Sequence, residues 1–255
     1  MLKAPEKFAG YGKGMVINMI KAVIFDMDGV LIDTEKHYFT GWKQASAEAG
    51  FPFTDEQALS LRSSDAKVAE KRMREIFGEE FDYYAIRERR RQLVKETLEQ
   101  CGLEKKPEVE ETLRYLREKG IRTAVATATP LDLTKEHLSR LGILELFDAI
   151  VSAKEVEHGK PAPDVYLYAC QQIGEKPEEC MAVEDSPNGI LSAYRAGLKP
   201  VMVPDLTQPD EALEMLLFGC VKSLAGVCQI IDNFGKDRRW TSSRETDMHP
   251  NHGSY

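Results

Sequence analysis

The fold is decided by residues 21–30, which read Lys21-Ala22-Val23-Ile24-Phe25-Asp26-Met27-Asp28-Gly29-Val30. A short apolar run ends abruptly at Asp26, and this pattern is typical of a strand that is buried on both faces of a parallel sheet. The polar residues after it form a loop at the carboxyl end of that strand. Ligands of parallel α/β sheets bind at such ends, so we expect this loop to carry function.

The pattern from about Glu35 to Cys101 is helical throughout, with no convincing strand. Gly50 ends the first predicted helix, and Thr54 begins the second with the residue types of a capping box. The first of these helices covers residues 37–49, and two more are predicted over 65–77 and 82–99. A helical block of this size, directly after the first strand, predicts a separate cap.

After Pro107 the sequence alternates between helix and strand. Helices are predicted over 108–119, 132–141, 163–173 and 188–196, and strands over 122–126, 149–152, 180–183 and 200–203. Such alternation is typical of βαβ units and a parallel sheet. We therefore predict an α/β fold, a Rossmann-like parallel-sheet core with an inserted helical cap domain. The expected division is a disordered extension (1–18), the core (19–34 and 104–234), the cap (35–103) and a polar, disordered tail (235–255).

The composition of the chain argues against several classes of function and location. The chain has 255 residues and a formal net charge of −8, and such an acidic balance argues against a nucleic-acid partner. No apolar run is long enough to span a membrane, and the first residues lack the apolar centre of a signal peptide. The five cysteines are widely spread, as in reduced cytoplasmic proteins. We expect a cytoplasmic protein with no membrane partner; the sequence gives no oligomeric state.

Candidate site residues follow each of the first four predicted strands. They are Asp26 and Asp28 after the first strand, Thr127, Ala128 and Thr129 after the second, Lys160 beyond the third, and Glu184, Asp185 and Asn188 after the fourth. Parallel strands bring these ends to one edge of the sheet. Four carboxylates in one pocket repel one another and resist ionisation unless a cation is present. Oxygen ligands favour a hard ion, and Mg²⁺ is the usual choice in phosphate chemistry.

These residue types predict Mg²⁺-dependent phosphoryl transfer. The cation and Lys160 together can hold a phosphoryl group and neutralise its developing charge. One carboxylate can act as the nucleophile, giving an aspartyl-phosphate, while another serves as general acid and base. The expected partner is a small phosphorylated substrate.

The stretch Asp26–Val30, with Thr127, Lys160 and the pair Glu184-Asp185, resembles the four motifs of the haloacid dehalogenase superfamily. The resemblance covers about residues 21–234, and the helical block lies where that superfamily inserts its cap. Dehalogenase members lack the second aspartate, which Asp28 supplies here, so dehalogenation is not expected.

The resemblance implies a role for each motif residue. Asp26 would be the nucleophile, Asp28 the general acid and base, Thr127 a phosphate ligand, and Lys160 the bridge between phosphate and nucleophile. Mg²⁺ would be held by Asp26, the backbone carbonyl of Asp28, Glu184 and Asp185, although Glu184 could instead orient the other ligands. The candidate substrate-binding residues are Gly29, Ala128, Asn188 and, on the cap, Arg62.

Other polar residues of the cap and tail have plainer interpretations. Arg87, Arg89, Arg90 and Arg91 form a basic cluster that we interpret as a solvated helix face, with substrate contact as the alternative. Thr129 is an alternative to Thr127 as the residue that binds the transferring phosphate.

The sequence is compatible with three functions. The first is a phosphatase acting on a small metabolite of the sugar phosphate class. The second is a sugar phosphomutase similar to β-phosphoglucomutase, in which a second sugar hydroxyl replaces water. Where the mutases carry a histidine on the hinge helix, Tyr38 stands here, and residues 61–65 do not match their substrate loop. The third, a non-catalytic binding module, is disfavoured because no position of the catalytic set is replaced.

Overall fold

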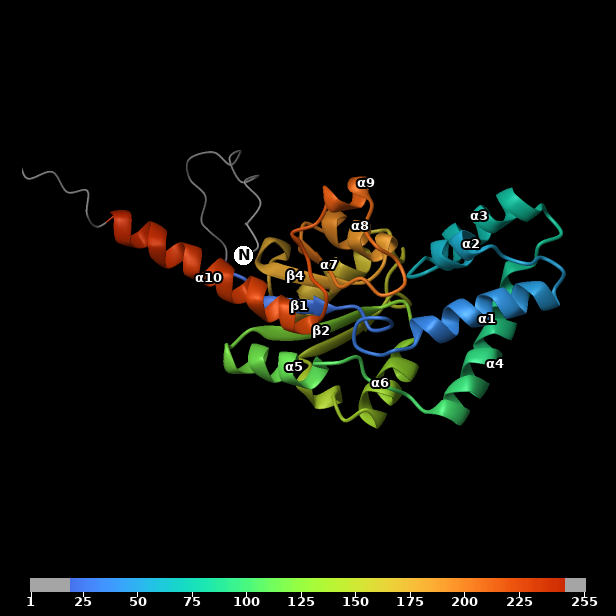
Figure 1. Ribbon diagram of the computed structural model, residues 1–255, viewed down its shortest axis with the longest axis horizontal. Coiled ribbons are helices and arrows are strands. Elements are labelled where there is room, and N and C mark those ends of the chain that lie inside the picture. Colours follow the sequence, from blue (N-terminus) through green and yellow to red (C-terminus); the bar gives the residue numbers. More distant parts are fainter. Residues whose placement is uncertain (1–18, 246–255) are drawn as a thin grey trace, which may run out of the picture.

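The computed structural model describes residues 19–245, and side chains as far as Phe234. Its centre is a six-stranded sheet in the order β3-β2-β1-β4-β5-β6, in which every neighbouring pair is parallel (Figure 1). The strands are β1 (Ala22–Phe25), β2 (Arg122–Thr127), β3 (Ala149–Ser152), β4 (Cys180–Glu184), β5 (Lys199–Met202) and β6 (Gly219–Cys220). The strand order reverses direction between β1 and β4. The predicted α/β fold with a parallel sheet is confirmed, while the predicted extension 1–18 lies outside the described residues.

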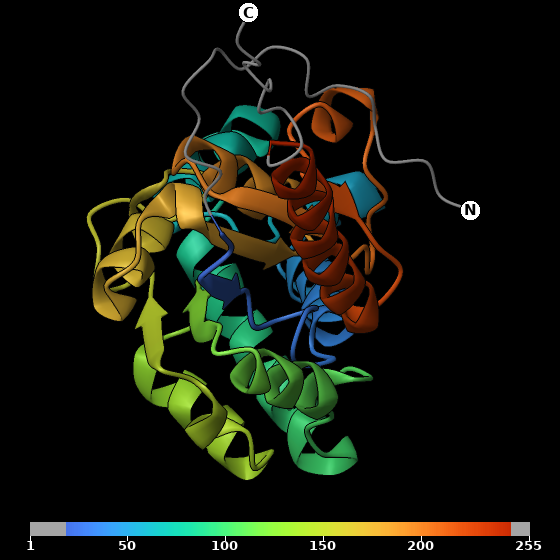
Figure 2. The same ribbon diagram turned by 90° about the vertical axis from the view of Figure 1, so that its left-hand side faces the viewer.

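Helices cover both faces of the sheet, as Figure 2 shows from one end. They are α5 (Val109–Glu118), α6 (Leu131–Arg140), α7 (Asp164–Ile173) and α8 (Pro187–Arg195), with 3₁₀ turns at Leu144–Leu146 and Pro177–Glu179. Side chains of β1 alternate between two hydrophobic cores. Val23 and Phe25 pack with α5 and α6, whereas Ala22 and Ile24 pack with α7 and α8. Burial on both faces explains why this strand is apolar throughout.

The inserted helices have a hydrophobic core of their own. They are α1 (Glu35–Glu48), α2 (Asp55–Ser60), α3 (Ala66–Phe77) and α4 (Tyr83–Cys101), and they lie at one end of the sheet (Figure 1). Phe53, Phe77 and Phe81 stack inside this block, with ring centroids 5.2–5.8 Å apart. The Thr54 capping box is present at the start of α2, as the sequence predicts.

The C-terminal region differs from the prediction. Beyond β5 the structure adds α9 (Glu211–Glu214), strand β6 and α10 (Leu224–Glu245), none of which the sequence analysis predicted. The end of α10 occupies part of the tail that was expected to be disordered, and that expectation is wrong as far as Glu245. Leu224 and Val227 anchor the helix in the core beside α5. Once a helix is nucleated by packing, its extension costs little free energy.

Candidate active site

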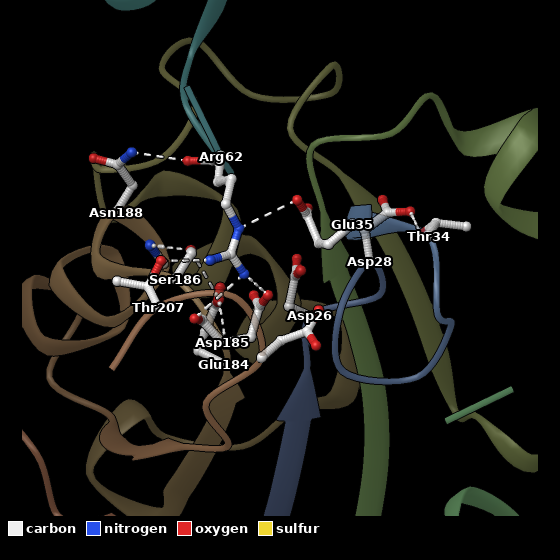
Figure 3. Close-up of polar contacts among 12 residues, drawn as sticks. Asp26, Asp28, Thr34, Glu35, Arg62, Glu184, Asp185, Ser186, Asn188 and Thr207 are labelled. Carbon is white, nitrogen blue, oxygen red and sulfur yellow. Dashed lines mark hydrogen bonds and ion pairs between the residues drawn. The ribbon is translucent and has the colours of Figure 1, made fainter. Parts of the chain in front are cut away.

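The candidate site lies at the carboxyl edge of the sheet, where β1 and β4 are neighbours. Asp26 directly follows β1, Thr127 ends β2 and Glu184 ends β4. Lys160 reaches the same place from the loop between β3 and α7. Figure 3 shows the carboxylates of Asp26, Glu184 and Asp185 gathered at this edge. The structure thus brings together the residues that the strand-end argument selected.

Lys160 is fully buried at the centre of the site. Its Nζ donates hydrogen bonds to Asp26 Oδ1 (2.6 Å), Glu184 Oε1 (2.6 Å) and the Ala126 carbonyl (2.9 Å). Burial lowers the pKa of Lys160, but the carboxylates of Asp26 and Glu184 outweigh it and raise that pKa above its ordinary value. The amine is therefore a permanent cation, held against the carboxylate that the resemblance identifies as the nucleophile.

Glu184 is held from several sides. Its Oε1 also accepts a hydrogen bond from the Tyr166 hydroxyl (2.7 Å), and its Oε2 accepts one from Ser186 (3.3 Å). A Cβ atom on Gly189 would lie 2.0 Å from this carboxylate, so glycine is required for the close approach of α8. Sequence reasoning missed Tyr166, because a tyrosine in a helix gives no local sign of its partner.

Asp185 has an oxygen atom that nothing in the described structure satisfies. Its Oδ1 is buried without a hydrogen-bond partner, and ligand oxygens of Asp26, Glu184 and Asp185 lie within 4.8 Å of one another. Burial raises the pKa of Asp26 and of Asp185 well above the ordinary aspartate value, although Lys160 and Arg62 oppose the two shifts. Carboxylates in this state gain from an added cation, so the residues present fit a metal ion.

Asp28 lies beside this acidic group and is held by two threonines. Thr34 Oγ1 donates to its Oδ1 (2.5 Å), and Thr129 Oγ1 donates to its Oδ2 (2.8 Å). The Thr127 hydroxyl accepts a hydrogen bond from the Thr129 backbone N–H (3.1 Å) and is buried. Thr127 and Thr129, the two candidates for binding the phosphate, therefore differ in their contacts, since Thr129 binds Asp28 and Thr127 does not.

Gly29 leaves room for the Asp185 side chain, and its backbone N–H is not free to bind substrate. Its backbone N–H donates to the Ile32 carbonyl (2.8 Å) and so is already used within the loop. Its φ angle is +86°, and a Cβ atom there would lie 2.1 Å from Asp185 Oδ2. Glycine is required at this position both for the backbone angle and for the approach of Asp185.

Arg62 enters the site from the inserted helices. Its buried guanidinium donates to Glu35 Oε2 (3.2 Å) and Thr207 Oγ1 (2.8 Å) and pairs with Asp185 (Figure 3). The Asn188 amide donates to the Arg62 carbonyl (2.8 Å), so this candidate substrate contact is used to hold the cap backbone. Burial raises the pKa of Glu35 to about 7, against the opposing charge of Arg62.

A model of the haloacid dehalogenase-like hydrolase family matches residues 20–197. The chain belongs to this family. The resemblance stated from the four motifs is thereby confirmed, and with it the expectation of an enzyme. Within the part of the chain that the structure describes, none of this hydrolase's helices has the length and apolar composition needed to cross a bilayer.

Named relatives share most of the length of this hydrolase. The phosphorylated carbohydrates phosphatase of Thermotoga maritima is 33% identical over 185 residues, which are 71% of this chain and 84% of that protein. The fructose-1-phosphate phosphatase YqaB of Escherichia coli is 29% identical over 181 residues, 71% of this chain and 95% of that one. The crystal structure of β-phosphoglucomutase from Clostridium difficile matches with a TM-score of 0.70, covering 85% of this chain and 99% of that one. At 20% identity this last likeness shows the fold alone.

A cavity of about 570 Å³ leads from the carboxylates of this hydrolase into the space between the inserted helices and the sheet. Asp26, Asp28 and the candidate substrate contact Ala128 line its inner end. Tyr38 lines it from α1, whereas the neighbouring His37 contacts the Cys101 sulfur atom (3.9 Å). Helix α1 thus presents Tyr38 to the cavity, at the position where the resemblance implies a histidine in the mutases.

Proposed function

We propose that this hydrolase is a Mg²⁺-dependent phosphatase that acts on a small phosphorylated carbohydrate through an aspartyl-phosphate. The observation that carries the proposal is the Lys160 amine, 2.6 Å from Asp26 Oδ1, beside the unpartnered oxygen of Asp185. A nucleophile, a fixed cation and a vacant ligand oxygen are what phosphoryl transfer requires. The phosphorylated carbohydrates phosphatase and the fructose-1-phosphate phosphatase among the relatives support the substrate class.

Asp26 and Asp185 are the side chains that would hold Mg²⁺, and the resemblance adds the Asp28 carbonyl. Among the described side chains, the acidic group that could share an ion consists of Asp26, Glu184 and Asp185, so the carboxylate of Asp28 is not part of it. This leaves the backbone carbonyl of Asp28 as the ligand that the resemblance implies. Both oxygens of Glu184 already accept hydrogen bonds, which favours a positioning role for it over direct ligation. When bound there, Mg²⁺ would supply positive charge for the phosphoryl oxygens.

The residues then act in two steps. In the first, an Asp26 oxygen attacks phosphorus, the bond between phosphorus and the ester oxygen breaks, and Asp28 donates a proton to the departing alkoxide. In the second, Asp28 takes a proton from water as that water attacks the aspartyl-phosphate, which releases inorganic phosphate and restores the Asp26 carboxylate. Thr34 and Thr129 hold Asp28 in place for both transfers. Thr127 is proposed to bind the transferring phosphate.

The inserted helices α1 to α4 are proposed to act as a cap that closes over bound substrate. They provide much of the cavity wall, whereas all residues assigned to chemistry lie outside them. Closure would exclude water and order the reaction centre. The five free cysteines support the proposal that the protein is cytoplasmic.

We expect phosphate release from a panel of phosphorylated sugars to require Mg²⁺. Chelation by EDTA removes the cation that the buried carboxylates need, so activity should fall to background and return when Mg²⁺ is added in excess. Inorganic phosphate and sugar phosphate isomers should be measured in the same samples. Isomer formation without phosphate release would identify a phosphomutase, and full activity in metal-free buffer would remove the cation from the proposal.

Asp28→Asn is expected to slow turnover about 10²–10⁴-fold, because an amide neither donates a proton to the leaving alkoxide nor accepts one from water. In pre-steady-state assays, p-nitrophenyl phosphate should lose less in the phosphorylation step than a sugar phosphate, since nitrophenolate leaves without a proton. Asp33→Asn is the control, because Asp33 lies on the same loop as Asp28 but pairs with Lys36 and Lys106 and does not line the cavity. Equal losses of phosphorylation rate for the two substrates would show that Asp28 is not the acid.

A further inference from the structure

The cavity is larger than a phosphoryl group needs. Its volume of about 570 Å³ lies in the range that holds whole metabolites or drug-sized ligands. Beyond the carboxylates, its walls come from α1 and α4 on the cap side and from α6 on the core side. The part of the substrate that does not react must therefore lie among these three helices.

Arg90 on α4 faces this part of the cavity and lacks an anionic partner. Its guanidinium lies 4.8 Å from the Tyr38 ring centroid and 4.7 Å from that of Trp42. Its Nε atom is buried without a hydrogen-bond partner, and no ion pair of Arg90 occurs among the side chains described. A cation–π contact stabilises a cation, but it leaves the guanidinium N–H groups without acceptors.

Of the neighbouring arginines, Arg87 and Arg91 also line the cavity, whereas Arg89 does not. Arg89 pairs with Glu48 (2.7 Å) and Arg91 with Glu88 (3.2 Å), both at the surface, as the sequence analysis expects. For Arg90 that interpretation is wrong. It stands four residues from Ile86 and from Val94, which are both buried, so it belongs to the inward-facing stripe of α4.

Five acidic residues line the cavity, and each has another partner. Asp26 pairs with Lys160, and Asp28 accepts hydrogen bonds from Thr34 and Thr129. Glu35 already pairs with Arg62, Glu99 with Lys95 (3.9 Å), and Glu136 with Arg140 (3.6 Å). The charge of Arg90 also acts on Glu35, but no ion pair joins the two among the described side chains. On the facing helix α6, Nδ1 of His137 is also buried without a partner. Arg90 is partly buried, and a desolvated guanidinium nitrogen without an acceptor costs free energy, which an incoming anion would recover.

We propose that the substrate carries a second anionic group, a carboxylate or a second phosphate, and that Arg90 binds it from the α4 wall of the cavity. This inference rests on the proposed phosphatase function and narrows its substrates to doubly anionic sugar derivatives. Tyr38 and Trp42 hold the guanidinium in position, and His137 offers a further hydrogen-bonding atom. Arg90 is then a specificity-determining residue that touches the part of the substrate that does not react.

Two matched substrate pairs test the proposal. Glucitol 6-phosphate and 6-phosphogluconate differ in one terminal group, as do fructose 1-phosphate and fructose 1,6-bisphosphate. The wild type should favour the doubly anionic member of at least one pair by about tenfold or more in kcat/KM, as expected for a charge-assisted hydrogen bond. Arg90→Gln should reduce that ratio to below about twofold. Arg89→Gln, one residue away and paired outside the cavity, should leave it unchanged.

Binding gives a readout that does not depend on turnover. The sequence contains two tryptophans, so Trp240→Phe leaves Trp42, which contacts Arg90, as the single fluorophore. In an Asp26→Asn/Trp240→Phe protein with Mg²⁺, the doubly anionic compound should bind about tenfold more tightly than its partner, and Arg90→Gln should abolish this difference. Circular dichroism confirms that each variant is folded.

The outcomes separate the two proposals. No preference in either pair, or equal losses on both members in Arg90→Gln, overturns the second-anion site while leaving the phosphatase intact. No phosphate release from any compound, p-nitrophenyl phosphate included, overturns the phosphatase. The fluorescence titrations then decide on Arg90 alone: a preference that Arg90→Gln removes supports the anion site, and equal binding contradicts it.

Discussion

Asp26→Asn is expected to abolish phosphatase activity, with a loss of at least about 10⁴-fold in kcat, while the protein stays folded. An amide oxygen is a far poorer nucleophile than a carboxylate, and no other carboxylate stands against Lys160 while also facing the cavity among the side chains described. Asparagine keeps the shape of aspartate, and its oxygen can still accept the hydrogen bond from Lys160. Steady-state release of phosphate measures the loss, and circular dichroism with thermal melting checks the fold.

The control for this prediction is Asp33→Asn, which makes the same chemical change on the same loop. Asp33 faces Lys36 and Lys106 and does not line the cavity. It should therefore keep activity within about threefold of the wild type, since surface ion pairs contribute little free energy. Activity of Asp26→Asn near the wild-type level would refute the covalent mechanism, because no route to the aspartyl-phosphate would remain.

Local sequence signals were enough to place the centre of the site. Each signal was an apolar run that ended at a polar residue, as at Phe25-Asp26 and Val183-Glu184, and the parallel topology joined those ends. The positions of Asp26, Glu184 and Asp185 follow from this rule, whereas Lys160 lies in the loop beyond the end of β3. Glycine and capping residues mark the helix boundaries. The catalytic roles of these residues remain predictions until the variants are measured.

The contacts that hold these residues could not be predicted in the same way. Glu184 is bound by Tyr166 from α7, and Arg62 by Thr207, 145 positions later in the chain. Such pairs depend on how helices and loops pack over the sheet, and neither partner carries a local pattern that names the other. The cap contact between Asn188 and the Arg62 carbonyl is of the same kind.

For α10 and Arg90, by contrast, the sequence carries a local signal, which is helical periodicity. The apolar residues at 224, 227, 231 and 234 recur at helical spacing before the polar end of the chain. In α4, residue 90 falls at the same spacing from buried positions 86, 94 and 98, which separates it from the solvated residues 89 and 91. In both cases helical periodicity was a better guide than composition.

Lys160→Met is expected to destabilise the protein by about 3–5 kcal/mol and to lower activity about 10²–10³-fold. Methionine fills a similar volume, but it leaves the buried carboxylates of Asp26 and Glu184 without the cation that pairs with both. The cost of a buried charge without its partner exceeds that of losing the hydrogen bonds alone. Chemical denaturation of the metal-free protein measures the stability. Lys154→Met, an exposed lysine on the same loop, should change stability by less than about 0.5 kcal/mol.

The pH dependence of this loss distinguishes charge from packing. Burial raises the pKa of Asp26 above its ordinary value, so the folded state binds this proton more tightly than the unfolded chain does. The free energy of unfolding therefore falls as the pH rises from the ordinary aspartate pKa to the raised pKa of the folded state. Removing Lys160 takes away the charge that opposes this shift. The stability deficit of Lys160→Met relative to the wild type should therefore grow from about pH 4 upward and shrink below it, where the carboxyl groups are protonated in both states. A deficit that is constant from pH 4 to pH 8 would mean that Lys160 stabilises the site by packing, and the electrostatic account of the site would be wrong.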